Sequence, residues 1–273
     1  MRTEESWPAR FQAELVRLGV PEPRARRLAE DTSAQAAEHA ADPAGLFGPA
    51  HLYARHLVAE LAAPVAAAPR FATAGPVLLS LAGVGKRFRR RAVLQDVDLT
   101  VRGGEVAAVV GANGCGKSTL LRICAGLTRP DSGTVHRTRR VGYVPQDGGT
   151  AGWLTADEHF TLFGAAAGVV PRRARSTGAH LAAKLAWRPE RAQRAQQLSG
   201  GTRQKLNLVL GQLHAPDLLL LDEPYQGFDQ GTYLDFWRQV HAWRDAGRAV
   251  VVVTHLLHDL TSVDHVLDLG ERR

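Results

Sequence analysis

A glycine-rich segment near the middle of the chain limits the possible folds more than any other part of the sequence. Residues 111–118 read GANGCGKS and match the pattern G-x-x-x-x-G-K-[ST]. The apolar run Val106–Val110 precedes this segment, and residues 118–125 continue as a helix-forming sequence. A buried strand that enters a glycine loop and then a helix is typical of a parallel sheet covered by helices. We therefore expect an α/β fold built around this turn.

The residues of this loop have the chemistry needed to bind a nucleotide. Its glycines leave successive backbone N–H groups free to surround phosphates at the start of a helix. Lys117 is suited to reach the β- and γ-phosphates, the Ser118 hydroxyl to ligate Mg²⁺, and Thr119 to contact the α-phosphate side. A chance match in a chain of this length has a probability on the order of one in a hundred. The predicted ATP-binding residues of the loop are Gly111, Ala112, Asn113, Gly114, Cys115, Gly116, Lys117, Ser118 and Thr119.

Two acidic residues follow a second apolar run, which reads LLLLDEP over residues 218–224. Asp222, at the end of the predicted strand, is suited to hold Mg²⁺ through water, as a Walker-B aspartate does. Glu223 would point to the opposite side of the extended backbone, toward the attacking water, and is the candidate general base. An acidic pair after a strand can also merely begin a helix, because carboxylates favour first turns. The phosphate-binding loop makes the catalytic interpretation the better one.

A histidine follows a third apolar run. Residues 249–253 are expected to form a strand, and His255 comes two positions later. Ligands bind at the carboxyl ends of parallel strands, so His255 is placed to sense the γ-phosphate and to hold Glu223 in position. A lone histidine is more often structural, and the chain has 11. His255 is chosen from among these histidines only because it follows the other motifs in the expected order.

Alternating strands and helices extend from residue 77 onward and form the larger predicted domain, residues 77–273. Within it we expect a helical subdomain of about residues 147–215. The predicted helices are those within residues 153–214 and one at 233–244. The predicted strands are 77–84, 93–101, 105–110, a short pair at 134–137 and 140–144, then 218–221, 249–253 and 266–269.

Residues 1–62 are predicted to form a separate, all-helical unit. Apolar residues recur at spacings of four and three from Trp7 to Leu18, which places them on one face of a helix. A second helix is expected over residues 23–39, and a third after Pro49 with Leu52, Leu57 and Leu61 on one stripe. Residues 63–76 are rich in Ala, Pro and Gly and are predicted to form a linker.

Composition bears on the compartment and on possible partners. The net charge is +7, but only four of the basic residues are lysine and the rest are arginine. A high content of Arg and Ala is typical of proteins encoded by GC-rich genes, so the charge need not indicate a nucleic-acid-binding surface. We therefore do not expect nucleic acid as a partner. The sequence has no run of 18 apolar residues and no signal-peptide core. These features favour a cytoplasmic protein in which Cys115 and Cys124 are free thiols.

One motif goes beyond the general phosphate-loop pattern. Residues 198–204 read LSGGTRQ, which resembles the signature motif of ABC (ATP-binding cassette) ATPases. Further motifs match that family in the same order. They are the Q-loop glutamine Gln146, the D-loop aspartate Asp229, the H-loop histidine His255 and, before the phosphate loop, Phe88 as the aromatic that stacks on adenine. The resemblance covers residues 77–270 and six motifs.

The resemblance implies a P-loop core with an antiparallel β subdomain and a helical signature subdomain. It implies that two cassettes dimerise head to tail, with each ATP between the phosphate loop of one copy and the signature loop of the other. The catalytic residues would be Glu223, His255, Lys117 and Gln146, and the Mg²⁺ ligands Ser118, Gln146 and Asp222. The signature residues acting in trans would be Leu198, Ser199, Gly200, Gly201, Thr202, Arg203 and Gln204. Departures from the usual motifs at Thr202, at the YQGFD D-loop and at Phe88 remove no catalytic group.

The segment WLTADEHFTLFGAAAGV, between Gln146 and Leu198, resembles the helical subdomain of bacterial exporters whose cassette and membrane subunits are separate chains. We therefore expect an exporter motor, peripheral on the cytoplasmic face of the membrane, that powers a polytopic permease subunit. Residues 1–62 would be a docking or regulatory module, or else an inert extension. The alternative is a soluble ABC ATPase that acts on nucleic acid, ribosomes or cofactor assembly. The single cassette and the lack of an inserted coiled coil make it the second choice.

Overall fold

The computed structural model describes residues 6–38, 42–44, 49–51, 53–55, 58, 75–89, 91–225, 227–228, 230–254 and 263–270. Contacts divide the chain into two compact units, Met1–Ala68 and Pro69–Arg273. The predicted site residues Asp229 and His255 lie outside the described residues, as do Leu52, Leu57 and Leu61 of the expected third helix. Most of the predicted linker, residues 63–74, lies outside them too.

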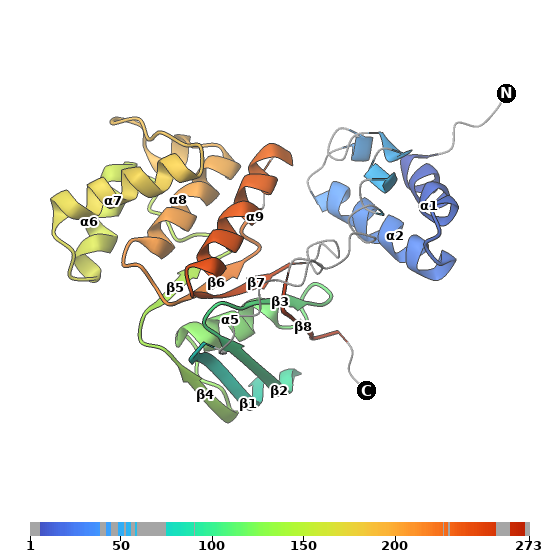
Figure 1. Cartoon of the computed structure of the whole chain (residues 1–273), viewed down its shortest axis with the longest axis horizontal. Coiled ribbons are helices and arrows are strands. Elements are labelled where there is room, and N and C mark those ends of the chain that lie inside the picture. Colours follow the sequence, from blue (N-terminus) through green and yellow to red (C-terminus); the bar gives the residue numbers. More distant parts are fainter. Residues whose placement is uncertain are drawn as a thin grey trace. The chain divides into compact units, whose positions relative to one another are not determined.

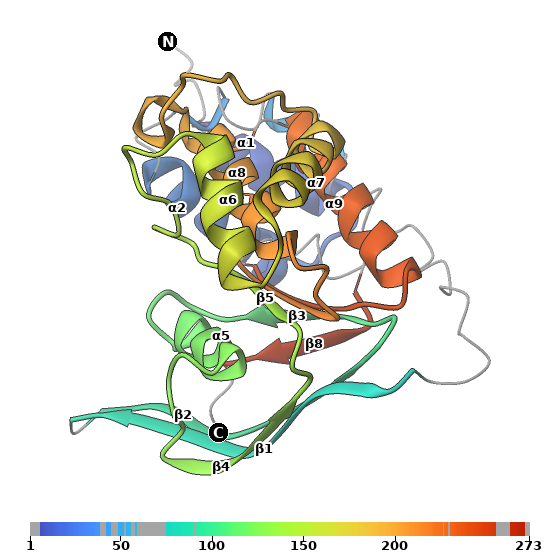
Figure 2. The ribbon, with the colours of Figure 1, turned by 90° about the vertical axis from the view of Figure 1, so that its left-hand side faces the viewer.

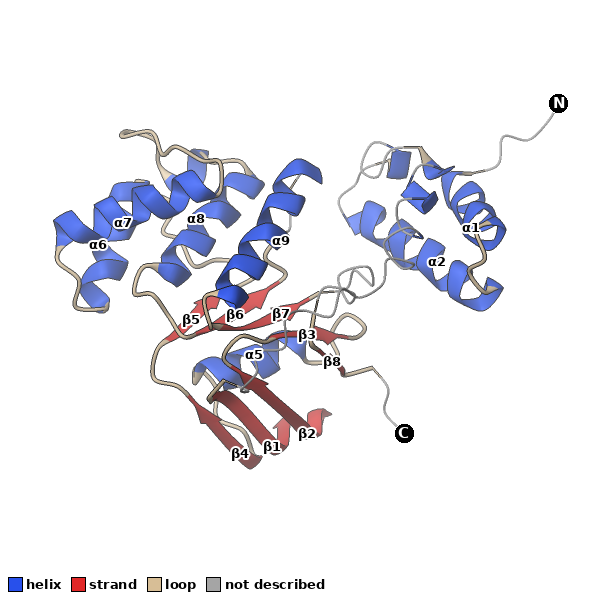
Figure 3. Cartoon of the chain, viewed as in Figure 1, coloured by secondary structure: helices blue, strands red, loops and turns tan. Residues whose placement is uncertain are grey.

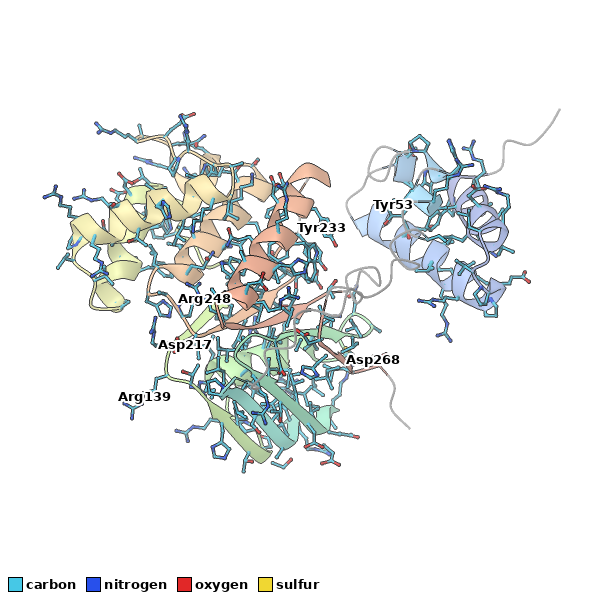
Figure 4. The ribbon with its side chains drawn as sticks, in the orientation of Figure 1. Tyr53, Arg139, Asp217, Tyr233, Arg248 and Asp268 are labelled. Atoms are coloured by element: carbon cyan, nitrogen blue, oxygen red, sulfur yellow. The ribbon has the colours of Figure 1, made fainter. Side chains whose placement is uncertain are left out.

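The first unit contains the helices α1 (Trp7–Arg17) and α2 (Glu22–Glu38), as predicted. Trp7 and Phe11 are buried one turn apart on α1 and stack with ring centroids 5.0 Å apart. Tyr53, labelled in Figure 4, lies in a helical stretch at residues 53–55 and packs on Phe11 with ring centroids 5.2 Å apart. An aromatic cluster thus forms the centre of this small unit, because narrow helical stripes are stable only when packed together.

A five-stranded parallel sheet organises the second unit, in the order β5-β6-β7-β3-β8. Its strands are β3 (Val106–Val110), β5 (Val141–Val144), β6 (Leu218–Asp222), β7 (Ala249–Val253) and β8 (His265–Asp268). Every residue of β3, β6 and β7 is buried, which explains why these strands are continuous apolar runs without alternation. The predicted parallel α/β core is confirmed.

Helices cover both faces of this sheet (Figures 1 and 2). The helix α5 (Lys117–Ala125) lies on one face. On the other lie α6 (Ala156–Ala166), α7 (Pro171–Lys184), α8 (Gly200–Gln212) and α9 (Gln230–Asp245), and a short 3₁₀ turn at Ala195–Gln197 precedes α8. Asp217 and Arg248, labelled in Figure 4, precede β6 and β7 and mark the amino edge of the sheet, whereas Asp268 ends β8 at the carboxyl edge.

A three-stranded antiparallel sheet lies beyond α5, in the order β2-β1-β4, as the red strands of Figure 3 show. Its strands are β1 (Val77–Phe88), β2 (Arg91–Arg102) and β4 (Ser132–Arg137). The expected pairing of residues 134–137 with 140–144 is wrong. β4 pairs antiparallel with β1, while β5 pairs parallel with the buried β6. The chain crosses from one sheet to the other at residues 138–140, where Thr138 N donates to Leu78 O and Asp217 N to Arg140 O.

The helices α6, α7 and α8 form the predicted helical subdomain. Thr155 and Glu158 form a capping box that starts α6. The fully buried ring of Phe160 packs against Gly178 of α7, where a Cβ atom would lie 2.4 Å from the ring. The buried His159 accepts a hydrogen bond at Nε2 from Ala151 N (2.9 Å) and donates from Nδ1 to Thr155 O (2.8 Å). The imidazole of His159 therefore ties the loop after β5 to α6.

In the part of the chain that the structure describes, no helix is both long enough and apolar enough to cross a lipid bilayer.

Candidate functional site

The glycine-rich loop begins at the carboxyl edge of the parallel sheet, between β3 and α5. Gly114 and Gly116 have φ angles of 74° and 113°, in the region that favours glycine. A Cβ atom on Gly116 would lie 2.8 Å from Val93 Cγ1 and 2.9 Å from Leu94 Cδ2 of β2, whereas one on Gly114 would meet nothing within 4 Å. The loop thus rests on the antiparallel sheet at Gly116 and leaves the backbone of Gly114 open.

Lys117, the first residue of α5, lies across its own loop. Its side chain is almost fully buried, and Nζ donates to Gly111 O (2.7 Å) and Ala112 O (3.2 Å). Both acceptors belong to the segment that would surround a phosphate. Phosphate oxygens are stronger partners for an ammonium group than neutral carbonyls, so an anion in the loop would draw this side chain toward it.

Ser118 and Asp222 meet although 104 residues separate them. The Ser118 hydroxyl donates to Asp222 Oδ1 across 3.2 Å, which joins the start of α5 to the end of β6. Burial raises the pKa of Asp222, the hydrogen bond from Ser118 opposes that rise, and the nearby Glu223 carboxylate adds to it. A hydroxyl and a carboxylate this close are the hard oxygen ligands that Mg²⁺ prefers.

Glu223 accepts a hydrogen bond from Gln146, whose Nε2 lies 3.1 Å from Glu223 Oε2. Gln146 comes from the loop after β5, so the contact joins two neighbouring strand ends. With its nitrogen directed at Glu223, the Gln146 amide keeps its oxygen available as a metal ligand. The expectation that Glu223 continues an extended backbone is wrong. β6 ends at Asp222, and Glu223 has a φ of 45°, so a tight turn directs its side chain.

Phe88 ends β1, and its ring is 50% exposed. Lys86 Nζ lies 5.5 Å from the centroid of the ring. Asp131 fixes this strand end by accepting from Lys86 Nζ (2.8 Å) and from Arg87 N (2.7 Å). The hydrogen bond from Lys86 is the first cause that lowers the pKa of Asp131. An exposed aromatic face on a fixed strand end is suited to stacking on a base.

The signature residues surround the first turn of α8. Ser199 is its N-cap, and its hydroxyl accepts from Thr202 N (3.2 Å) and lies 2.9 Å from Thr202 Oγ1. Ser199, Gly200 and Arg203 are exposed, whereas Leu198 and Gln204 are buried. Of the seven predicted trans residues, the structure therefore turns these two side chains into the core and away from any external nucleotide.

The start of α8 also touches the turn that follows β6. A Cβ atom on Gly201 would lie 2.5 Å from Gly227 O, so the two backbones meet with no room for a side chain between them. Asp229, two residues further on, is one of the two predicted site residues that the structure does not describe.

Two polar contacts near the site involve residues that sequence reasoning missed. The Tyr225 hydroxyl donates to Thr254 Oγ1, which joins the turn after β6 to the residue that follows β7. Asn207 of α8 donates to Gly148 O (3.1 Å) in the loop that carries Gln146. Tyr225 lies two residues after Glu223, and Thr254 lies one residue before His255. This closeness in sequence to predicted site residues was the signal that could have identified them.

Comparison with known proteins agrees with this geometry. A sequence model of the ABC transporter family matches residues 94–226. An aliphatic sulfonates import ATP-binding protein of Ralstonia nicotianae is 36% identical over 199 residues, which cover 70% of this chain and 68% of that protein. A zinc import ATP-binding protein of Yersinia pestis bv. Antiqua is 36% identical over 204 residues, with coverage of 72% and 77%.

A relative of different organisation is the ABC transporter ATP-binding/permease protein of Mycobacterium tuberculosis. It is 35% identical over 196 residues, but the match spans only 22% of its length and 66% of this chain. Among solved structures, an ATP-binding subunit of an ABC transporter is similar with a TM-score of 0.63, at 26% identity over 71% of this chain and 87% of that one.

A dimeric post-hydrolysis cassette bound to ADP and Pi has the same fold, with a TM-score of 0.63 at 22% identity over 71% of this chain and 97% of that one. Fold, order of motifs and sequence similarity agree. The chain therefore belongs to the ABC transporter family, as one of its ATPase domains.

Proposed function

We propose that this chain binds ATP at the carboxyl edge of the parallel sheet and hydrolyses it there. The backbone of residues 111–116 and the ammonium group of Lys117 bind the phosphates. The exposed face of Phe88 stacks on adenine. Ser118, Asp222 and the amide oxygen of Gln146 hold Mg²⁺, which when bound neutralises charge on the phosphates.

Glu223 is the general base of the proposed reaction. Its carboxylate lies at the strand end next to the Ser118–Asp222 pair and is held by the Gln146 amide at 3.1 Å. From there it accepts a proton from the attacking water. The meeting of these four side chains from three separate segments is the observation that carries the proposal. His255 and Asp229 keep their predicted roles in γ-phosphate sensing and in the D-loop.

Two copies would complete the site. Ser199 and Gly200 are exposed at the N-terminus of α8, where backbone N–H groups and the helix dipole favour an anion. In a head-to-tail dimer this turn faces the γ-phosphate held by the phosphate loop of the second copy. ATP then joins the two copies, and hydrolysis releases them.

Substitution of the base tests this mechanism. Glu223→Gln removes the proton acceptor but keeps the shape of the side chain, so we expect an ATP-dependent dimer that persists in light scattering while phosphate release stops. Lys117→Ala should abolish nucleotide binding. The matched controls are Glu190→Gln and Lys184→Ala, both at exposed positions of the helical subdomain. A Glu223→Gln chain that hydrolyses ATP at the wild-type rate would contradict the proposal.

The partner we propose is a separate, polytopic membrane subunit, with the cassette peripheral on the cytoplasmic face of the membrane. Apolar side chains are exposed on α6 and at its flanks, namely Trp153 (70% exposed), Leu162 and Val170. The nearby loop after β5 carries Gln146, so a partner bound here contacts the segment that reaches the nucleotide. The helical unit of residues 1–62 is a second candidate for docking.

Copurification from membranes tests the partner. The wild-type chain should recover a protein with several apolar spans of about 20 residues each. Trp153→Ser combined with Leu162→Ser should reduce that recovery and leave ATP binding unchanged. Recovery of ribosomal proteins or nucleic acid alone would instead favour a soluble ABC ATPase.

The direction of transport needs its own test. Export is the prediction from the resemblance in residues 153–169, but the two relatives above that are named for a direction are import proteins. In vesicles with the cassette outside, ATP should drive substrate into the lumen if the system exports and out of it if the system imports.

A further inference from the structure

The hydrogen bond between Tyr225 and Thr254 joins the turn that follows the proposed base to the end of β7. We propose that Tyr225 is a positioning residue that holds Glu223 in its active geometry by anchoring the turn after β6 to the end of β7. This inference rests on the proposed function of Glu223. It assigns Tyr225 no contact with nucleotide, because its hydroxyl is directed at Thr254.

Glu223 needs such an anchor because its backbone is in an unfavourable conformation. A positive φ is uncommon for a residue other than glycine, and Glu223 has a φ of 45°. It also precedes Pro224, and the proline ring favours an extended conformation in the residue before it. Conformations of this kind persist only where the surrounding structure enforces them.

The structure holds this turn from both sides. On the upstream side, Asp222 is paired with Val253 in the parallel ladder of β6 and β7. On the downstream side, the Tyr225 hydroxyl donates to Thr254, whose side chain is fully buried and whose N–H donates to Val109 O (3.1 Å). Val109 belongs to β3, the strand that leads into the phosphate loop. Tyr225 thus links the turn of the base to the strand that carries the nucleotide loop.

Aromatic residues of α9 fix the ring of Tyr225 in place. Tyr225 is buried and packs edge-on against Tyr233 (ring centroids 5.3 Å apart) and Phe236 (5.9 Å), both from α9. Tyr233 is labelled in Figure 4. A ring held by aromatic neighbours has little rotational freedom, so its hydroxyl is preorganised toward Thr254. Phenylalanine in its place would keep this ring packing and remove the hydroxyl that donates to Thr254.

Steady-state kinetics of the full-length chain test the proposal. One net hydrogen bond corresponds to a change of about 2- to 12-fold in rate. We expect Tyr225→Phe to lower kcat by this factor and to leave the Kd for ATP, measured on the Mg²⁺-free protein, within about twofold. Thr254→Val should lower kcat equally, and Thr254→Ser, which keeps the hydroxyl, should restore it. A control at a hydroxyl away from this turn, Thr161→Val on α6, should change neither value.

A double variant separates positioning from general loss of structure. If Tyr225 acts only through Glu223, then in a Glu223→Gln chain, whose hydrolysis has already stopped, Tyr225→Phe should leave the ATP-dependent dimer as stable as in Glu223→Gln alone. The inference is overturned if Tyr225→Phe keeps the wild-type kcat, or if it weakens ATP binding as much as it lowers kcat. If Glu223→Gln itself leaves hydrolysis intact, the proposed function fails instead. Should Tyr225→Phe not fold, the comparison of Thr254→Val with Thr254→Ser decides the question.

Discussion

Two glycines of the phosphate loop make a matched pair for testing how the loop is supported. Gly114 and Gly116 both have a positive φ, so alanine at either position is strained by about 1–2 kcal/mol. Only Gly116 is also packed tightly. An alanine Cβ there would lie 2.8 Å from Val93 Cγ1, 2.9 Å from Leu94 Cδ2 and 3.0 Å from Val93 O.

The two substitutions should therefore differ by the cost of overpacking alone. Leu94 is buried and the Val93 carbonyl belongs to the backbone, so crowding at Gly116 adds about 1–3 kcal/mol to the strain. We expect Gly114→Ala to lower the free energy of unfolding by about 1–2 kcal/mol and Gly116→Ala by about 2–5 kcal/mol. For a unit of this size the difference corresponds to roughly 2–12 °C in Tm.

Urea unfolding followed by tryptophan fluorescence measures this difference. Of the five tryptophans, all but Trp7 lie in the unit Pro69–Arg273, so the signal reports mainly on the cassette. Equal losses in the two variants, or a larger loss for Gly114→Ala, would refute the packing of the loop against β2.

Three further outcomes follow from burial and packing. Because burial raises the pKa of Asp222 above its usual 3.8, its contribution to stability in metal-free protein is present at low pH and is lost as the pH rises through the raised pKa. In urea titrations, Asp222→Asn should therefore gain stability relative to wild type over that range, and a constant difference would count against the raised pKa. Gly178→Ala should destabilise the cassette by about 1–3 kcal/mol because its Cβ meets the buried Phe160 ring, while Gly152→Ala, whose Cβ would lie at an ordinary contact distance of 3.4 Å from Gln196 Cβ, should not, as Tm values would show. Burial raises the pKa of Cys124 to about 12, so mass spectrometry should find this thiol unalkylated at about pH 8 until the chain unfolds.

Short sequence motifs predicted much of this site because many of its functional groups lie on consecutive residues. The phosphate loop and the pair Asp222–Glu223 each follow an apolar run, and parallel topology brings their strand ends to one edge. The same motifs do not reveal which strands pair with each other. Residues 134–137 and 140–144 are both predicted as strands, but the residue pattern within each strand does not specify that β4 pairs with β1 and β5 with β6.

Properties that depend on distant residues were also out of reach. The φ of Glu223 is opposed by Pro224 and is enforced by contacts with β7, so the local sequence alone favours the wrong conformation. The resemblance assigns all seven signature residues the same role in trans. In the structure, however, Gln204 lies on the same buried face of α8 as Asn207.

The approach of Gly201 to Gly227 has a mechanical consequence. With the Gly227 oxygen 2.5 Å from where a Cβ of residue 201 would lie, no compressible side chain separates the first turn of α8 from the turn after β6. A rotation of the helical subdomain would therefore press the start of α8 on this turn, which Asp222 and Tyr225 anchor to the end of β7. The hinges of such a rotation then lie at residues 145–150 and 213–217, where the chain enters and leaves the subdomain. The turn that carries the base is thus in direct backbone contact with α8 on one side and joined to β7 on the other.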